Sequence, residues 1–354
     1  MEVNHSEECF FLVNPDFDKV HNRYTTNFIT GIINGIFSPV AVIGNFAVLF
    51  IIFRTAWLRE PSSLLLGCLA VCDMLVGVIV QPSYVSFRLS ENRDNFVPCL
   101  VRMTYSTSFF ICYGVSFLTL NAISYERYMA LALHLRYKAL VTKRRLLMLA
   151  ALIWILNTSL TCLQWAGINT TVRAIHLTLW FVCLLTSGLL QFKIFGIVRR
   201  HHDEIRRQEI QLNSYANSYR RQLKLAVNIA YIVGIYIFFN LPVLVVTTYH
   251  QIVQGNLSSY NYYSWAETVA LLNSSLNPIV CCWRSRNIRK AIFKHLAVWI
   301  TCTCNTLNAE NERPEASGIN SRRYDCRCQV QLKSLNRLQE LKIEQESYTQ
   351  ISSS

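Results

Sequence analysis

Residues 103–128, MTYSTSFFICYGVSFLTLNAISYERY, decide the fold of this chain. The first part, from Met103 to Tyr125, contains no charged residue, and Glu126 and Arg127 follow it directly. A membrane-spanning helix needs roughly 20 apolar residues, so this run is long enough to cross a bilayer. The charged pair at its end marks the place where the helix meets water.

The rest of the chain is also unusually apolar, because 52% of its 354 residues are hydrophobic and only 16% are charged. That balance favours the membrane class over a water-soluble domain. The runs lack the alternating pattern of barrel strands, so we predict an all-α membrane protein, a seven-transmembrane helix bundle. The predicted spans are residues 28–53, 62–87, 101–125, 146–165, 174–192, 225–249 and 260–283.

Basic residues gather in the segments after the first, third and fifth spans, which should face the cytoplasm. We therefore interpret the net charge of +13 as a topology signal and expect no nucleic-acid partner. The predicted organisation is an extracellular segment at 1–27, a core at 28–283, an amphipathic membrane-surface helix at 284–298 and a mostly disordered cytoplasmic tail at 299–354. The predicted location is the plasma membrane, with multiple passes and the N-terminus outside.

Several modifications follow from this topology. Asn4, Asn169 and Asn256 begin N-glycosylation triplets in segments predicted to lie outside. Cys302 and Cys304 follow the amphipathic segment, whose basic face suits the inner leaflet lipids, and are candidates for palmitoylation.

Most of the 13 cysteines fall inside spans or in the cytoplasmic tail. Only Cys9, Cys99 and Cys162 are expected to reach the outer side, where disulfides form. At most one disulfide is expected, and a Cys9–Cys99 bond is one pairing.

Six motifs, each in the expected span and order, resemble those of class A (rhodopsin-like) G-protein-coupled receptors. They are Gly44-Asn45, Leu69-Ala70-Val71-Cys72-Asp73, Glu126-Arg127-Tyr128, Trp154, Pro242 and Asn277-Pro278. The resemblance covers roughly residues 44–296. It implies a receptor, not an enzyme, that passes an extracellular signal to a heterotrimeric G protein, with arrestin and receptor kinases as further partners.

Asp73 is an acid at membrane depth, where a lone carboxylate is costly. The resemblance implies a hydrated sodium site completed by Ser116, Asn273 and Asn277, all of which supply oxygen ligands. A neutral acid that hydrogen-bonds to neighbouring helices is the alternative reading. No resident cofactor is expected other than this allosteric ion.

The activation switch implied by the family begins at Arg127, which should pair with Glu126 at rest and contact the G protein when released. Tyr128 completes the motif, and Leu135 matches the loop residue that enters the G-protein alpha subunit.

Pro242 and Pro278 should kink their helices. Asn240 stands where the family has a switch tryptophan, and Cys281 stands where it has a tyrosine. These departures predict weak or unusual coupling.

The outer end also departs from the pattern. Arg102 occupies the expected disulfide position, and the short second outer loop, roughly 166–173, has no cysteine. These features resemble the melanocortin, lysophospholipid and cannabinoid receptors. The stretch that starts at Phe192 resembles adenosine receptors.

The predicted ligand pocket contains aromatic residues and one acid: Tyr105, Phe109, Phe110, Tyr113, Tyr249 and Glu267. Such residues suit a peptide, a lipid or a nucleoside. Phe109 stands where amine receptors place an acid, and Leu271 stands where visual pigments place a lysine, so both of those ligand classes are disfavoured. Glu267 is predicted to be the only acid at its depth, and it either meets a cationic ligand group or reaches the aqueous mouth.

Two alternatives remain at the level of sequence. A decoy or constitutively active receptor would explain the missing switch residues. A transporter is disfavoured because no internal repeat is visible, and a membrane enzyme is disfavoured because no catalytic set accompanies Asp73.

Overall fold

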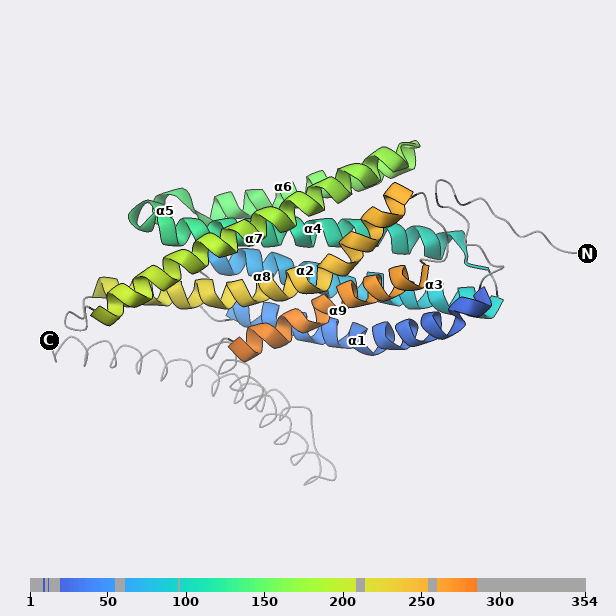
Figure 1. Cartoon of the computed structure of the whole chain (residues 1–354), viewed down its shortest axis with the longest axis horizontal. Coiled ribbons are helices and arrows are strands. Elements are labelled where there is room, and N and C mark those ends of the chain that lie inside the picture. Colours follow the sequence, from blue (N-terminus) through green and yellow to red (C-terminus); the bar gives the residue numbers. More distant parts are fainter. Residues whose placement is uncertain are drawn as a thin grey trace, which may run out of the picture. The chain divides into compact units, whose positions relative to one another are not determined.

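The computed structural model describes residues 9, 12, 20–54, 61–94, 96–207, 214–253 and 260–284. Within these ranges the regular elements are helices joined by short connections, and Cys9 and Leu12 form one isolated bridge. The helices, drawn in Figure 1, are α1 (Val20–Arg54), α2 (Pro61–Leu75), η3 (Val76–Val80), α3 (Gln81–Asp94), α4 (Cys99–Ala132), α5 (His134–Leu140), α6 (Lys143–Cys162), η4 (Leu163–Ala166), α7 (Asn169–Arg207), α8 (Ser214–Val253) and α9 (Tyr260–Arg284).

Six stretches are long and apolar enough to cross a membrane by length and composition. They are Arg23–Arg54, Ser63–Arg93, Cys99–Ala132, Lys143–Ala166, Thr170–Arg200 and Ala226–Tyr249. The seventh predicted span corresponds to α9, which packs against α1 and α8 and contributes many buried polar side chains. The prediction of an all-α membrane bundle is confirmed.

The second span is longer than predicted and is built from α2, η3 and α3 in succession. The middle piece, Val76–Val80, is a π-helical turn, an irregularity that often accompanies functional sites. The span continues to Arg93, past the predicted end at residue 87, and Arg88 and Glu91 are buried within it.

The connection between α6 and α7 is a tight turn. Leu163–Ala166 forms a 3-10 turn, and α7 begins at Asn169. Gly167 takes φ 83°, the left-handed conformation that costs glycine no steric strain. The predicted loop at 166–173 is therefore wrong at its far end, because Arg173 already lies inside α7.

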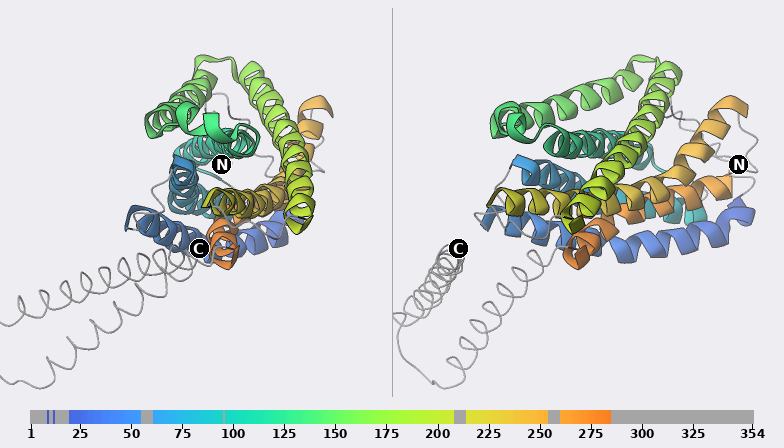
Figure 2. Two further views of the ribbon diagram at one scale, coloured as in Figure 1. Left: turned by 90° about the vertical axis from the view of Figure 1, so that its left-hand side faces the viewer. Right: turned by 60° about the vertical axis from the view of Figure 1, so that its left-hand side comes forward.

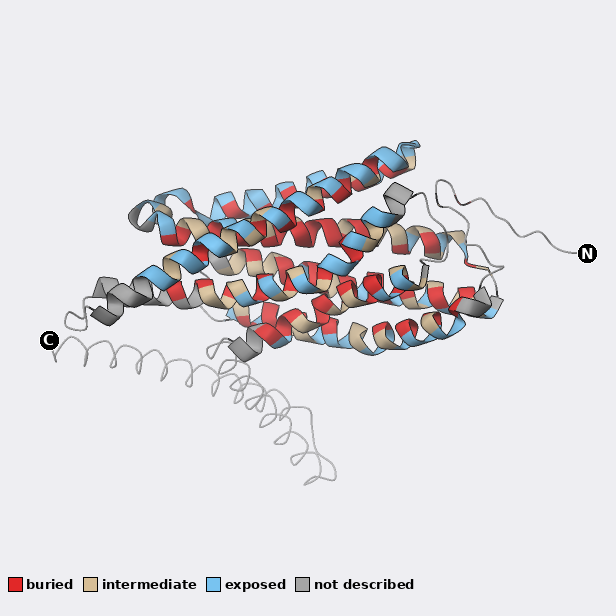
Figure 3. Cartoon of the chain, viewed as in Figure 1, coloured by how far each residue is buried: buried red, intermediate tan, exposed pale blue. Residues whose placement is uncertain are grey.

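The main hydrophobic core surrounds α4, which contributes Phe109, Phe117 and Leu120 among others. Helices from several parts of the chain lie around it in the end-on view of Figure 2. Buried residues follow the inward faces of the helices and exposed residues the outward faces (Figure 3). Many of the outward residues are large and apolar, as expected for helices whose neighbour is lipid; Phe192 is 79% exposed.

Helix α8 bends part-way along its length, as Figures 1 and 2 both show. Pro242 lies inside this helix, and a proline removes one backbone hydrogen bond and favours a bend. Pro278 lies inside α9 in the same way. The predicted amphipathic segment at 284–298 and the tail lie outside the described residues, except for Arg284.

Candidate functional site

Asp73 on α2 is 1% exposed and receives two hydrogen bonds from α9. Ser274 Oγ donates to its Oδ1 at 2.8 Å, and Asn277 Nδ2 donates to its Oδ2 at 2.6 Å. Ser274 was not predicted, although it lies three residues before Asn277 and hence on the same helical face. These bonds join α2 to α9 at the depth of the acid.

Ser116 and Asn273, the other predicted sodium ligands, are also buried. Ser116 Oγ donates to Cys72 Sγ at 3.3 Å, next to Asp73 in sequence. Asn273 Oδ1 and Asn277 Oδ1 are buried oxygens without a hydrogen-bond partner. Carboxylate and amide oxygens are the ligands that a hard cation prefers, so the residues present fit a sodium ion.

Asn45 on α1 reaches the same level of the bundle. Its Nδ2 donates to the Ser274 carbonyl at 3.0 Å and to the Ala41 carbonyl at 2.9 Å. The motif residues of α1, α2 and α9 therefore form one connected polar cluster.

The predicted switch at the end of α4 is a close, buried ion pair. Arg127 Nε donates to Glu126 Oε2 at 2.5 Å, and a terminal guanidinium nitrogen donates to Oε1 at 2.6 Å. Tyr137 on α5 also donates to Glu126. Tyr137 was missed, because nothing in the sequence fixes the direction of a side chain in this short helix.

Two other members of the predicted switch have different surroundings. Lys193 Nζ lies 5.7 Å from the ring centroid of Tyr128, within cation–π range. Asn240 is buried and donates to the Tyr236 carbonyl at 2.7 Å. The side chain of Leu135 lies outside the described part of the structure.

The predicted aromatic pocket residues of α4 form a continuous cluster. The ring centroids are 5.9 Å apart for Tyr105 and Phe109, and 4.9 Å apart for Phe109 and Tyr113. Phe110 and Tyr113 both contact Trp180 of α7, at 5.6 Å and 4.9 Å. Trp180 was missed because its span is apolar on every side and gives no periodic signal.

Tyr249 does not join this cluster. Its side chain is 56% exposed, near the end of α8 beyond Pro242. The structure thus places Tyr249 outside the aromatic cluster, and its role in ligand binding stays a prediction.

Glu267 belongs to a buried ionic network that links three helices. Arg88 of α3 contacts Glu267 of α9 at 3.1 Å and Glu91 at 3.4 Å, and Arg23 of α1 contacts Glu91 at 3.1 Å. Asn27 adds a hydrogen bond to Glu91 at 3.0 Å. The prediction that Glu267 is the only acid at its depth is wrong, because Glu91 shares its arginine partner.

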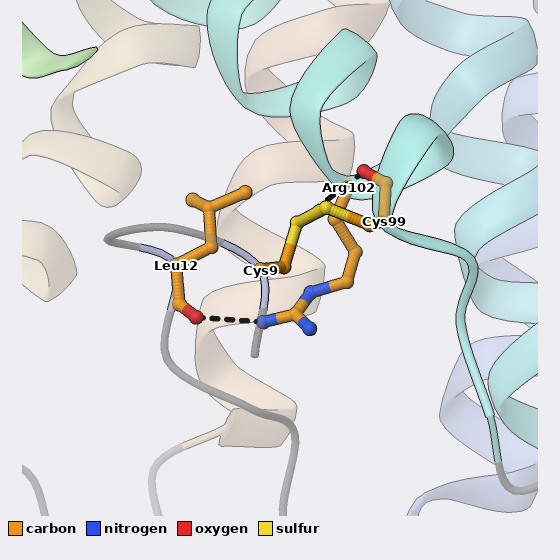
Figure 4. The surroundings of a disulfide bond; sticks show 4 residues. All are labelled: Cys9, Leu12, Cys99 and Arg102. Carbon is orange, nitrogen blue, oxygen red and sulfur yellow. Dashed lines mark hydrogen bonds between the residues drawn. A yellow bond between two sulfur atoms is a disulfide. The ribbon is translucent and has the colours of Figure 1, made fainter. Parts of the chain in front are cut away.

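The start of α4 is tied to the N-terminal segment (Figure 4). Cys9 and Cys99 form a disulfide, and Arg102 donates to the Leu12 carbonyl at 2.9 Å. The arginine at the usual disulfide position thus contacts the same short segment.

Of the predicted glycosylation sites, Asn169 is the first residue of α7, while Asn4 and Asn256 lie outside the described residues. The same holds for Cys302 and Cys304.

Residues 44–187 match the family of seven-transmembrane receptors of the rhodopsin family. This part of the chain is therefore similar to that family. Cannabinoid receptor 2 of Homo sapiens is 26% identical over 296 residues, which cover 78% of this chain and 81% of the relative. Adenosine receptor A2b of Homo sapiens is 26% identical over 322 residues, covering 78% and 92%. The A2b receptor of Mus musculus is 25% identical over 318 residues, covering 77% and 90%. These three relatives are receptors by name.

Proposed function

We propose that this receptor carries an extracellular signal to a heterotrimeric G protein by rearranging its helices. The observation that carries the proposal is the buried pair of Arg127 and Glu126, which Tyr137 also contacts. A buried arginine held by a neighbouring acid forms a two-state element, since another partner for the acid would release the guanidinium. The described state is the paired one, and coupling requires its opening.

The proposed ligand site is the aromatic cluster of α4 with Trp180. The cluster includes Tyr105, Phe109 and Tyr113, all buried between helices. The names of two relatives, cannabinoid receptor 2 and adenosine receptor A2b, support a lipid or a nucleoside ligand. A peptide is the remaining class that such aromatic residues suit.

The proposed regulator is a sodium ion at Asp73. Ser116, Asn273 and Asn277 would complete its ligand set, and the orphaned amide oxygens of Asn273 and Asn277 support this assignment. When bound, the ion would favour the helix packing that keeps these oxygens close together.

The proposed topology places the N-terminus outside and the C-terminus at the cytoplasmic face of the plasma membrane. The Cys9–Cys99 disulfide supports it, because disulfides persist in oxidising compartments. Arrestin and receptor kinases are proposed as further cytoplasmic partners, and Cys302 and Cys304 as lipid anchors.

The second candidate is a decoy or constitutively active receptor. Asn240 is bonded to its own helix in place of a switch tryptophan, and this observation favours weakened coupling.

The test is guanine-nucleotide exchange on purified G proteins, measured with the full-length receptor and with Arg127→Ala in lipid nanodiscs. Receptor-dependent exchange that Arg127→Ala abolishes supports coupling. Equal exchange with the two proteins, at the level without receptor, favours a decoy. A parallel arrestin-recruitment assay in cells shows which transducer responds.

A further inference from the structure

The buried ionic network around Arg88 has equal numbers of positive and negative side chains. Arg23 and Arg88 carry two positive charges, and Glu91 and Glu267 carry two negative charges, with all four side chains buried. A ligand cation that took Glu267 would compete with Arg88, and a ligand anion would compete with two carboxylates for Arg88. Displacing one member of a buried pair leaves another charge uncompensated. The network therefore disfavours charged ligands of both signs.

The guanidinium of Arg88 also connects this network to the aromatic cluster. Its Cζ lies 4.9 Å from the centroid of Tyr84 and 5.3 Å from that of Phe87. Both of these rings contact Tyr105, at 5.5 Å and 6.0 Å. The charge-balanced network and the aromatic cluster are thus continuous, and a ligand that stacks on Tyr105 lies next to the network.

Three polar groups at the other end of the cluster lack partners. The hydroxyl of Tyr113, the indole nitrogen of Trp180 and the hydroxyl of Tyr236 have no hydrogen-bond partner, and their residues are only 7%, 1% and 3% exposed. They come from α4, α7 and α8, three separate helices. In a protein interior nearly every such group is bonded, because leaving one unpaired is costly.

Phe117 holds the three groups together as one cluster. Its ring centroid lies 4.9 Å from that of Tyr113, 5.6 Å from that of Trp180 and 5.2 Å from that of Tyr236. The indole N–H can only donate, and each hydroxyl can donate. All three groups therefore lack a hydrogen-bond acceptor, and their residues pack against an aromatic ring.

We infer that Tyr113, Trp180 and Tyr236 form a donor subsite that binds an uncharged, aromatic ligand through its acceptor atoms. The inference rests on the proposed ligand site and narrows its ligand class to neutral molecules with an oxygen or nitrogen acceptor on a flat ring. Tyr113, Trp180 and Tyr236 would determine which ligands the subsite accepts.

Three probes of matched size test the subsite on full-length receptor in lipid nanodiscs. Quinoline is neutral with one ring acceptor, naphthalene has no acceptor, and 1-methylquinolinium is a cation without a free acceptor. Dissociation constants are measured by saturation-transfer NMR without G protein. The variants are Tyr113→Phe, Tyr236→Phe and Trp180→Phe, with Tyr125→Phe as the control, since Tyr125 lies on the same helix α4 but is exposed.

The expected result is that the quinoline dissociation constant rises about twofold to tenfold in at least one of the three variants, as for the loss of one neutral hydrogen bond. Naphthalene should bind all variants as it binds the wild type, and Tyr125→Phe should change nothing. Each probe also partitions into the lipid of the nanodiscs. This background is the same for every variant, so it is removed when one probe is compared between variants.

Two results would overturn the inference. In one, the three variants change the heat stability of the probe-free receptor but bind quinoline like the wild type, which assigns the donors to structural water. In the other, 1-methylquinolinium binds as tightly as quinoline. Nucleotide exchange is measured separately. If the protein binds quinoline as expected but does not activate G proteins, the proposed function is refuted and the donor subsite is not.

Discussion

Gly44 on α1 lies against the ring of Pro278 on α9, so that a Cβ added at residue 44 would come within 2.6 Å of the proline Cγ. The two residues belong to different sequence motifs, yet they pack directly against each other. The smallest side chain lets α1 approach the proline of α9, and this contact lies beside the Asn45 bond to Ser274.

Gly44→Ala should therefore destabilise the protein by about 1–3 kcal/mol, the usual cost of overpacking. Gly35→Ala is the matched control, since nothing lies within 4 Å of a Cβ at this position of the same helix. There, alanine should be neutral or stabilising, because glycine is a poor helix former. Heat inactivation of the two variants in nanodiscs measures the difference, and equal midpoints would refute the packing argument.

The ionic network predicts an order of stabilities. Glu91→Gln deprives two arginines of a carboxylate, Arg23 and Arg88, whereas Glu267→Gln deprives Arg88 alone and leaves it next to Glu91. Glu91→Gln should cost about 3–5 kcal/mol, as for breaking a buried pair, and Glu267→Gln should cost less. The midpoints of heat inactivation give the order, and the reverse order would mean that Glu267 is the central acid of the network.

The buried pair at the end of α4 predicts the level of basal signalling. Glu126→Gln weakens the hold on Arg127 and should raise basal exchange by about threefold or more, a shift of roughly 0.6 kcal/mol. Tyr137→Phe removes one donor to Glu126 and should give a smaller rise. Tyr231→Phe, at an exposed tyrosine, is the control. Basal exchange below the wild-type level in Glu126→Gln would contradict a restraining role for this acid.

If the proposed site at Asp73 binds sodium, the ion should stabilise the protein at constant ionic strength. Replacing choline chloride with sodium chloride should raise the midpoint of heat inactivation, because an ion that binds only the folded state stabilises it. Asp73→Asn should abolish this rise, and Ser116→Ala should reduce it. Ser108→Ala is the control on the helix of Ser116, because the Ser108 hydroxyl donates to two backbone carbonyls of its own helix. A sodium effect that survives in Asp73→Asn would exclude this site.

The disulfide should be worth about 2–4 kcal/mol of stability. Cys9→Ser and Cys99→Ser should each lower surface expression and heat stability, and the double variant should be no worse than either single one. Cys162→Ser is the control, because this cysteine is free and exposed. Additive losses in the double variant would show that the two residues act independently.

The fold and part of the site could be predicted from the sequence, and the reason lies in the bilayer. Long apolar runs have few alternatives to spanning helices, and an acid at membrane depth such as Asp73 is costly without a partner. Asn277 could be named in advance because Asn277-Pro278 resembles a motif of the receptor family, and the structure brings it to Asp73.

The ionic network could not be predicted in the same way. Arg88 and Glu91 follow an apolar run, where charged side chains usually reach water. Their burial depends on Arg23 and Glu267, which are distant in sequence. Trp180 was not predicted for a different reason. A helix with apolar residues on every side gives no indication of which face points inward.

The Cys9–Cys99 bond closes a covalent ring that spans a sequence separation of 90 residues and encloses α1, α2, η3 and α3. A protease that cuts once anywhere between these two positions opens the ring but releases no fragment. On a denaturing gel such a nicked chain would migrate near full length until a reducing agent is added, and then separate into two pieces.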